Sequence, residues 1–232
     1  MLFGRSIQDM LLSIPALIIA LTIHEFCHGY AAYLLGDKTA KWDGRLSFNP
    51  LRHLDPLGSL MILLVGFGWA KPVMVNPYNL RNPKRDMAFI ALAGPVSNFI
   101  TAFFTLFVLW WLIAFDIGTI QSGYSIWRVL PAVMSLHGNI MSYVYRVIFL
   151  VFQINIGIGL FNLIPIPPLD GSKILGSFLP HHLYFRYMNF RYWLIVLVIM
   201  LITVIPTILG PFMMGIEQLY SFIITRFLGL FF

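Results

Sequence analysis

The sequence predicts an all-α multi-span membrane protein, and its composition is the first reason. Of the 232 residues, 59% are hydrophobic and only 10% are charged, whereas a soluble domain carries about 25% charged residues. The mean hydropathy is +0.83, and several uncharged runs reach the roughly 20 residues that a helix needs to cross a bilayer. We therefore expect one domain, residues 1–232, in the lipid bilayer. Basic loops account for the net charge of +6, so no nucleic-acid partner is expected.

Four apolar segments are the second reason, because each is expected to span the membrane as a helix. They cover residues 7–35, 86–115, 146–164 and 192–209. The intervening residues 116–145 mix polar, glycine and proline residues, which predicts a loop or surface segment. A last segment, 211–232, carries apolar residues at helical spacing. It is either a fifth span or a helix lying along the bundle.

The segment 57–70 is apolar but short for a span, and it is interrupted by Gly58, Gly66 and Gly68. It predicts a re-entrant, β-like segment near residues 57–75. Irregular backbone survives at membrane depth only where it is buried in protein or lines a water-filled cavity.

The basic residues predict the orientation of the chain. If the amino terminus lies outside, twelve of the fifteen Lys and Arg residues fall on the inner side. Only Arg5, Arg128 and Arg146 then lie outside. Because cytoplasmic loops carry an excess of Lys and Arg, we expect a multi-pass protein of the cell (inner) membrane in this orientation.

The first span contains the pattern HExxH, formed by His24, Glu25 and His28. Histidines four residues apart share one helix face and can bind one Zn²⁺, and the glutamate can act as a general base. With six histidines and two glutamates in the chain, chance supplies only about 0.001 such matches. The alternative is a polar trio bonded to neighbouring helices. Ionisable groups at membrane depth are costly, which favours the metal site.

A catalytic zinc needs a third protein ligand, and depth favours Asp170. The first and third spans both run from outside to inside, and His28 and Asp170 both lie near the inner ends. Asp116 lies at the outer side, and Glu217 lies in the last segment. Three prolines and Gly171 around Asp170 predict a rigid, non-helical backbone that suits a ligand.

These motifs resemble those of the site-2 protease family of intramembrane zinc metalloproteases. The segment His24–His28 resembles the family's HExxH, Asn162–Gly171 its second motif, and Gly94–Asn98 a third motif on the middle core helix. The resemblance covers residues 7–180 and implies a three-helix catalytic core, followed by one or two further spans at 190–232. The chain is similar to short, minimal members without a PDZ or CBS domain.

The resemblance implies a mechanism and one Zn²⁺ per chain. The expected zinc ligands are His24, His28 and Asp170. Because His28 and Asp170 both lie near inner ends of spans, the active site is expected to open toward the cytoplasmic side. Glu25 is expected to take a proton from the attacking water and pass it to the leaving amine. Asn162 is expected to donate a hydrogen bond to the developing oxyanion.

The implied substrate is a single-span membrane protein, for example an anti-sigma factor or another membrane-tethered regulator. A helix hides its peptide bonds, so the substrate must unwind before it is cut. The re-entrant residues could offer a strand edge to it, and these residues are Gly66, Phe67, Gly68 and Trp69. Asn98 is expected to permit close helix approach and is also a candidate for substrate contact.

Three other functions remain as alternatives. A zinc transporter or other membrane zinc-binding protein without proteolytic activity should carry polar residues on several spans, and often an internal repeat. A proteolytically inactive receptor would usually lack the glutamate that stands here as Glu25. A membrane protease of the other HExxH type would need a downstream glutamate ligand, and Glu217 has no supporting acidic partner in sequence.

Overall fold

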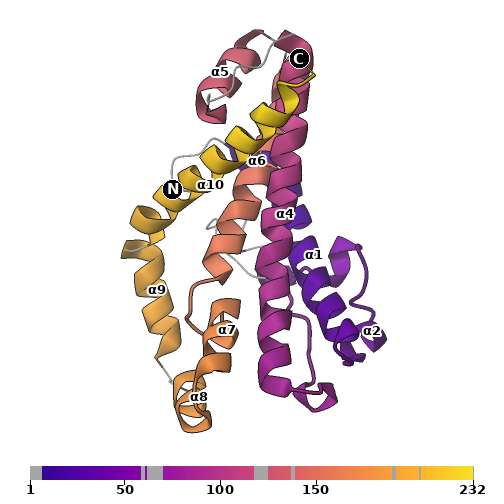
Figure 1. Ribbon diagram of the computed structural model, residues 1–232, viewed down its shortest axis with the longest axis vertical. Helices are drawn as coiled ribbons and strands as arrows, with labels where there is room; N and C mark the ends of the chain where they lie inside the picture. The colour runs from indigo at the N-terminus through magenta and orange to yellow at the C-terminus, as the bar shows by residue number, and fades with distance from the viewer. Residues whose placement is uncertain are drawn as a thin grey trace.

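The computed structural model describes residues 7–58, 61, 70–117, 125–136, 139–189, 192–203 and 205–231, and the regular elements in these ranges are helices. They are α1 (Ile7–Leu34), α2 (Thr39–Trp42), α4 (Pro83–Ile117), α5 (Ile126–Leu136), α6 (Asn139–Asn162), α7 (Asp170–Phe178), α8 (His181–Met188), α9 (Trp193–Thr203) and α10 (Ile205–Leu228), with 3-10 turns η1 (Pro50–Arg52) and η2 (Pro77–Asn79). The long helices α1, α4 and α6 pack on one another. Figure 1 shows α2, α7 and α8 at one end of this bundle and α5 at the other.

Within the described ranges, four helices are long and apolar enough to cross a membrane. They are Met10–Leu34, Pro83–Asp116, Ile140–Asn162 and Thr207–Leu228. The first three include most of the first three expected spans, so the prediction of an all-α multi-span membrane protein is confirmed.

Residues 116–145 are expected from the sequence to form a loop or surface segment, and the expectation of a loop is wrong for the described residues of this range. Residues 126–136 form α5, and α6 already begins at Asn139 rather than at Arg146. Ile126, Leu130 and Val133 recur at helical spacing and are buried, which stabilises α5. Tyr145 is also buried in the core, so the first turns of α6 are held by tertiary packing that local composition does not reveal.

The fourth expected span, residues 192–209, falls on the helix α9, which covers Trp193–Thr203, and on the first residues of α10, which begins at Ile205. Residue 204 lies outside the described residues. The apolar part of α10 is 22 residues long, so the last segment is itself long enough to span. Figure 1 shows α10 running obliquely across α6 toward the far end of α4.

The largest apolar core joins α4, α5, α6 and α10 at the end of the bundle that carries α5. It is built around buried side chains such as Leu106, Tyr145 and Ile224. A polar contact adds to it, because the indole of Trp110 donates to Ser221 Oγ at 3.1 Å. These contacts hold the core helices together away from the HExxH residues.

The ends of the expected re-entrant segment lie together. Leu54 and Ala70 form an isolated antiparallel bridge, and the Lys71 amide donates to the His53 carbonyl at 2.8 Å. After this bridge, residues 71–76 have no regular secondary structure and lead into η2. Gly66, Phe67, Gly68 and Trp69, the residues expected to offer a strand edge, lie outside the described residues.

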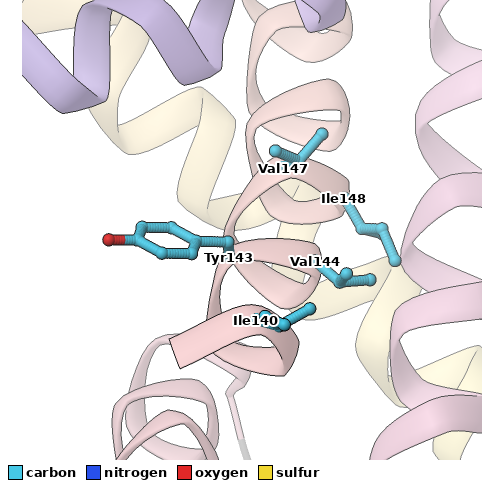
Figure 2. Close-up of a pocket in the computed structure, with 5 residues that line it drawn as sticks. All are labelled: Ile140, Tyr143, Val144, Val147 and Ile148. Atoms are coloured by element: carbon cyan, nitrogen blue, oxygen red, sulfur yellow. The ribbon is translucent and has the colours of Figure 1, made fainter. Parts of the chain in front are cut away.

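A shallow apolar groove of 390 Å³ runs along the first turns of α6 (Figure 2). It is lined by Ile140, Tyr143, Val144, Val147 and Ile148. An apolar surface of this kind on a spanning helix suits contact with lipid tails, and none of the expected site residues lines it.

Candidate metal centre

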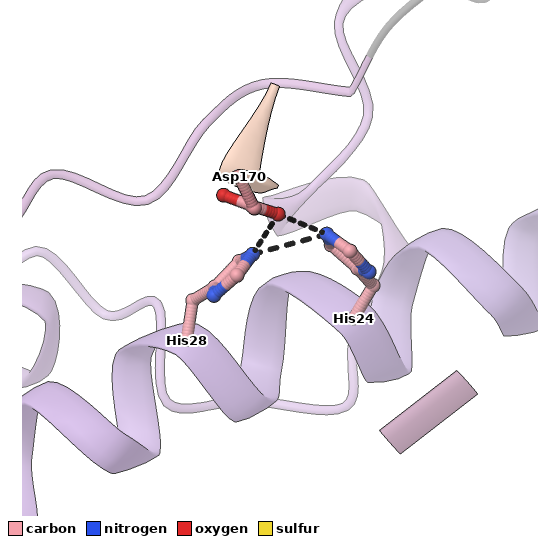
Figure 3. A group of neighbouring side chains, drawn as sticks. All are labelled: His24, His28 and Asp170. Atoms are coloured by element: carbon pink, nitrogen blue, oxygen red, sulfur yellow. Dashed lines mark hydrogen bonds and ion pairs between the residues drawn. The ribbon is translucent and has the colours of Figure 1, made fainter. Parts of the chain in front are cut away.

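The two histidines of HExxH lie on one face of α1. The rings of His24 and His28 meet edge to face with their centroids 4.5 Å apart. Their Nε2 atoms are 3.0 Å apart, and only 4% and 8% of the two residues is exposed. The i, i+4 spacing therefore does bring two potential ligand atoms to one point, as Figure 3 shows.

Asp170, the first residue of α7, supplies the third atom of the cluster. Its Oδ2 lies 3.1 Å from Nε2 of His24 and 3.0 Å from Nε2 of His28 (Figure 3). Its other oxygen, Oδ1, accepts a hydrogen bond from Lys173 Nζ at 3.1 Å.

Each imidazole is fixed through its other nitrogen. Nδ1 of His28 lies 2.7 Å from the carbonyl oxygen of Ile90, which can only accept, so Nδ1 carries the hydrogen. Nδ1 of His24 lies 2.6 Å from Oδ1 of Asn98. The amide nitrogen of Asn98 donates to the Ala20 carbonyl at 3.2 Å, so its oxygen faces His24 and accepts from Nδ1. When each ring is neutral, Nε2 is then a bare lone pair.

This donor set fits a zinc ion. Two imidazole lone pairs and one carboxylate oxygen point at one another across 3.0–3.1 Å, and they repel unless a cation lies among them. A tetrahedral zinc with bonds of about 2.0–2.2 Å separates its ligands by about 3.3–3.5 Å, close to the distances observed. Hydrogen bonding of each ligating histidine through its second nitrogen is also typical of zinc sites. In the described part of the chain, His24, His28 and Asp170 are the group that could hold a metal ion.

Two glycines allow the helices to approach the cluster. A Cβ at Gly94 of α4 would lie 2.5 Å from Nε2 of His28 and 2.6 Å from Cε1 of His24. A Cβ at Gly171 would collide with the carbonyl oxygens of Leu163 and Ile164. Only glycine lets α4 lie against both imidazoles and lets the turn before α7 close beneath Asp170.

Glu25 contacts the irregular segment that precedes η2. Its Oε2 accepts a hydrogen bond from the Val73 amide at 3.0 Å. This leaves the second carboxylate oxygen, Oε1, for a proton. The side chain is partly buried, beside the two histidines on α1.

The structure places the two expected asparagines differently. Asn98 is fully buried, and its amide faces His24 rather than a surface that a substrate could reach. The amide of Asn162 is half-buried and donates to the Ile158 carbonyl of its own helix at 3.1 Å. Sequence reasoning missed Asn155, which contacts Asn98 at 2.8 Å. Its signal was an amide side chain in the apolar run VFQINIGIG, which also contains Gln153.

Comparison with known proteins gives one family. The model of peptidase family M50 matches residues 12–206 of this chain. YwhC of Bacillus subtilis (strain 168), named as a candidate zinc metalloprotease, is 40% identical over 172 residues, which cover 71% of this chain and 67% of YwhC.

Two further relatives carry the same type of name. Rip2 of Mycolicibacterium smegmatis is 30% identical over 97 residues, which cover 40% of this chain and 37% of Rip2. Rip2 of Mycobacterium tuberculosis (strain Erdman) is 28% identical over 117 residues, or 45% of this chain and 44% of that protein. The alignments thus span less than half of either Rip2 protein. No solved structure matches the chain significantly.

Proposed function

Because the chain belongs to the site-2 protease family, peptidase family M50, we propose that it is an intramembrane zinc metalloprotease. It hydrolyses peptide bonds within or near the transmembrane helices of other membrane proteins. The observation that supports this proposal most directly is the meeting of His24, His28 and Asp170 at 3.0–3.1 Å, with Glu25 next to the first ligand.

The residues of the chain divide the chemistry between them. A zinc ion held by His24, His28 and Asp170 supplies the Lewis acidity that amide hydrolysis requires. Glu25 takes a proton at Oε1 from the attacking water and returns it to the leaving nitrogen, while the Val73 amide holds Oε2. Asn162 has a second amide hydrogen beyond its bond to Ile158, and this hydrogen serves a developing oxyanion once a substrate is bound.

The substrate is a single-span membrane protein such as a membrane-tethered regulator, and it enters from the bilayer. His28 lies six positions before the end of α1 at Leu34, or about 9 Å along the helix axis. The site therefore opens near the end of the bundle that carries α2, α7 and α8, which we assign to the cytoplasm. Residues 7–180 form the catalytic core of a single domain, and residues 190–232 add its C-terminal helices.

Glu25→Gln separates hydrolysis from metal binding. The amide keeps the shape of the side chain but cannot take a proton. We expect the variant to retain about one zinc per chain while cleavage of a single-span substrate in proteoliposomes falls about 10²–10⁴-fold. Metal analysis of the purified protein and gel-based cleavage assays measure the two quantities.

Two companion variants complete this test. Asp43→Asn removes an exposed carboxylate from a polar loop and should change neither quantity, whereas His24→Ala should lose the zinc. Cleavage by Glu25→Gln at the parental rate would refute the mechanism. A parental protein that binds zinc and cleaves no membrane substrate would instead be a membrane zinc-binding protein or transporter.

A further inference from the structure

A chain of polar side chains runs from the candidate metal centre through the three core helices. His24 of α1 contacts Asn98 of α4 at 2.6 Å, and Asn98 contacts Asn155 of α6 at 2.8 Å. Both asparagines are 0% exposed, and His24 is 4% exposed. Three buried polar groups at membrane depth cost free energy unless each is paired. Their presence here therefore suggests a role in addition to helix packing.

The direction of every bond in this chain is determined by two backbone carbonyls. The Asn155 amide nitrogen donates to the Val151 carbonyl at 2.8 Å, so its oxygen turns toward Asn98. The Asn98 amide nitrogen donates to that oxygen and to the Ala20 carbonyl. Because a carbonyl can only accept, neither amide can be turned over without placing oxygen against oxygen. The oxygen of Asn98 is thereby presented to Nδ1 of His24.

We propose that Asn155 is a positioning residue for the metal centre, which acts through Asn98 to keep Nε2 of His24 free of hydrogen and aimed at the metal. This inference rests on the proposed zinc site and assigns it a support from the third core helix. The competing arrangement places a hydrogen on Nε2, where it would bond Oδ2 of Asp170 at 3.1 Å, and turns the Asn98 nitrogen toward Nδ1. In that arrangement the hydrogen on Nε2 bonds to Asp170 and occupies the lone pair that would bind zinc, so it opposes zinc binding.

Without Asn155 only the Ala20 carbonyl would oppose the turned-over amide of Asn98. That bond is the longer of the two, at 3.2 Å against 2.8 Å. Removal of Asn155 should therefore populate the competing arrangement. Groups that orient a ligating histidine typically contribute 10–100-fold to metal affinity, and because Asn155 acts through an intermediate we expect about the lower end of that range.

Asn155→Leu tests the inference, since leucine has a similar volume and suits an apolar helix. We expect the zinc affinity of the detergent-purified protein, measured by competition with a chromophoric chelator, to fall about 10-fold. In the zinc-free protein, ¹⁵N shifts of labelled histidine should show the His24 hydrogen moving partly from Nδ1 to Nε2. Gln153→Leu, which removes an amide from another face of the same helix, is the matched control and should change neither readout.

Parental zinc affinity in Asn155→Leu would overturn the inference, and so would a lower affinity with the hydrogen still on Nδ1, because that result indicates a packing role alone. If the leucine variant does not fold, Asn155→Ser takes its place in the same two measurements. A wrong assignment of the zinc site can be distinguished from a wrong role for Asn155, since His24→Ala would retain zinc if the zinc site were wrongly assigned. Loss of zinc in His24→Ala together with full affinity in Asn155→Leu rejects only the role of Asn155.

Discussion

Asp37 lies just past the end of α1 and holds the segment that contacts Glu25. Its Oδ2 accepts from the Asn76 amide at 2.7 Å, and its Oδ1 accepts from Asn79 Nδ2 at 2.8 Å. Thr39 adds a hydroxyl bond at 2.6 Å and a backbone bond at 3.1 Å. One buried carboxylate therefore ties the segment after the Leu54–Ala70 bridge to the helix that carries the candidate site.

These bonds predict an acid-sensitive contribution to stability. Burial raises the pKa of Asp37, but the hydrogen bonds from Thr39, Asn79 and Asn76 outweigh it and lower the pKa below its usual value. The contribution is thus complete above the unfolded-state pKa of about 3.9 and is lost as the pH falls through the lower folded-state pKa. Asp37→Asn should destabilise the protein by about 2 kcal/mol near neutral pH.

Thermal unfolding in detergent at several pH values checks this expectation. The difference between the parent and Asp37→Asn should be constant near neutral pH and shrink once the pH falls below about 4. Asp43→Asn, in the exposed loop that follows α2, serves as the control. A difference that grows on acidification would contradict the proposed role of the carboxylate.

At the scale of elements, α4 packs against both histidines of the candidate metal centre and holds them in place. Gly94 lets its backbone touch both imidazoles, Ile90 holds His28, and Asn98 holds His24. At the opposite end, Glu217 of α10 accepts a hydrogen bond from the first amide of α5, that of Ile126, at 3.0 Å. Glu217, the second glutamate of the chain, therefore joins α10 to α5 and does not contact the candidate metal centre.

Gly94→Ala should disrupt the metal centre without removing any ligand. The added methyl would lie 2.5 Å from Nε2 of His28, so α4 or the imidazoles must move apart. We expect zinc affinity to fall by about 100-fold or more, the upper end of the range for groups that orient ligands. Chelator competition on the purified variant measures the loss.

Gly157→Ala on α6 is the control for this variant. A Cβ at Gly157 would have nothing within 4 Å, and alanine favours a helix, so zinc affinity and thermal stability should be retained. Equal zinc affinity in both variants would show that the close approach of α4 does not matter for the site.

For the whole molecule, the orientation in the membrane decides which compartment reaches the metal centre. The cluster includes the first residue of α7, and Figure 1 shows α7 with α2 and α8 at one end of the bundle and α5 at the other end. With the amino terminus outside, as we propose, the end that carries α2, α7 and α8 faces the cytoplasm, where basic residues concentrate.

Single cysteines at the two ends test this orientation in intact cells. In a Cys27→Ala background, a membrane-impermeant maleimide should label Arg128→Cys on α5 directly. It should label Lys41→Cys on α2 only after the cells are permeabilised, because both positions are exposed but lie on opposite sides. The reverse pattern would place the metal centre on the outer side and refute the cytoplasmic assignment.

The sequence by itself determined the membrane class, three of the spans and the pair of histidines. These signals are local, because hydropathy is summed over about 20 residues and HExxH lies within one turn of helix. The error fell where tertiary packing outweighs local composition, because residues 126–136 are helical through burial in the core.

Only the tertiary structure decided how the site is completed. His24 and Asp170 are 146 positions apart, and His24 and Asn98 are 74 apart, so no local pattern reports their distance. Depth, backbone rigidity and motif resemblance suggested Asp170, but they assigned no role to Asn155 and none to the Val73 amide on Glu25. A hydrogen bond depends on distances of about 3 Å and on direction, and these are set by how α1, α4, α6 and α7 pack against one another.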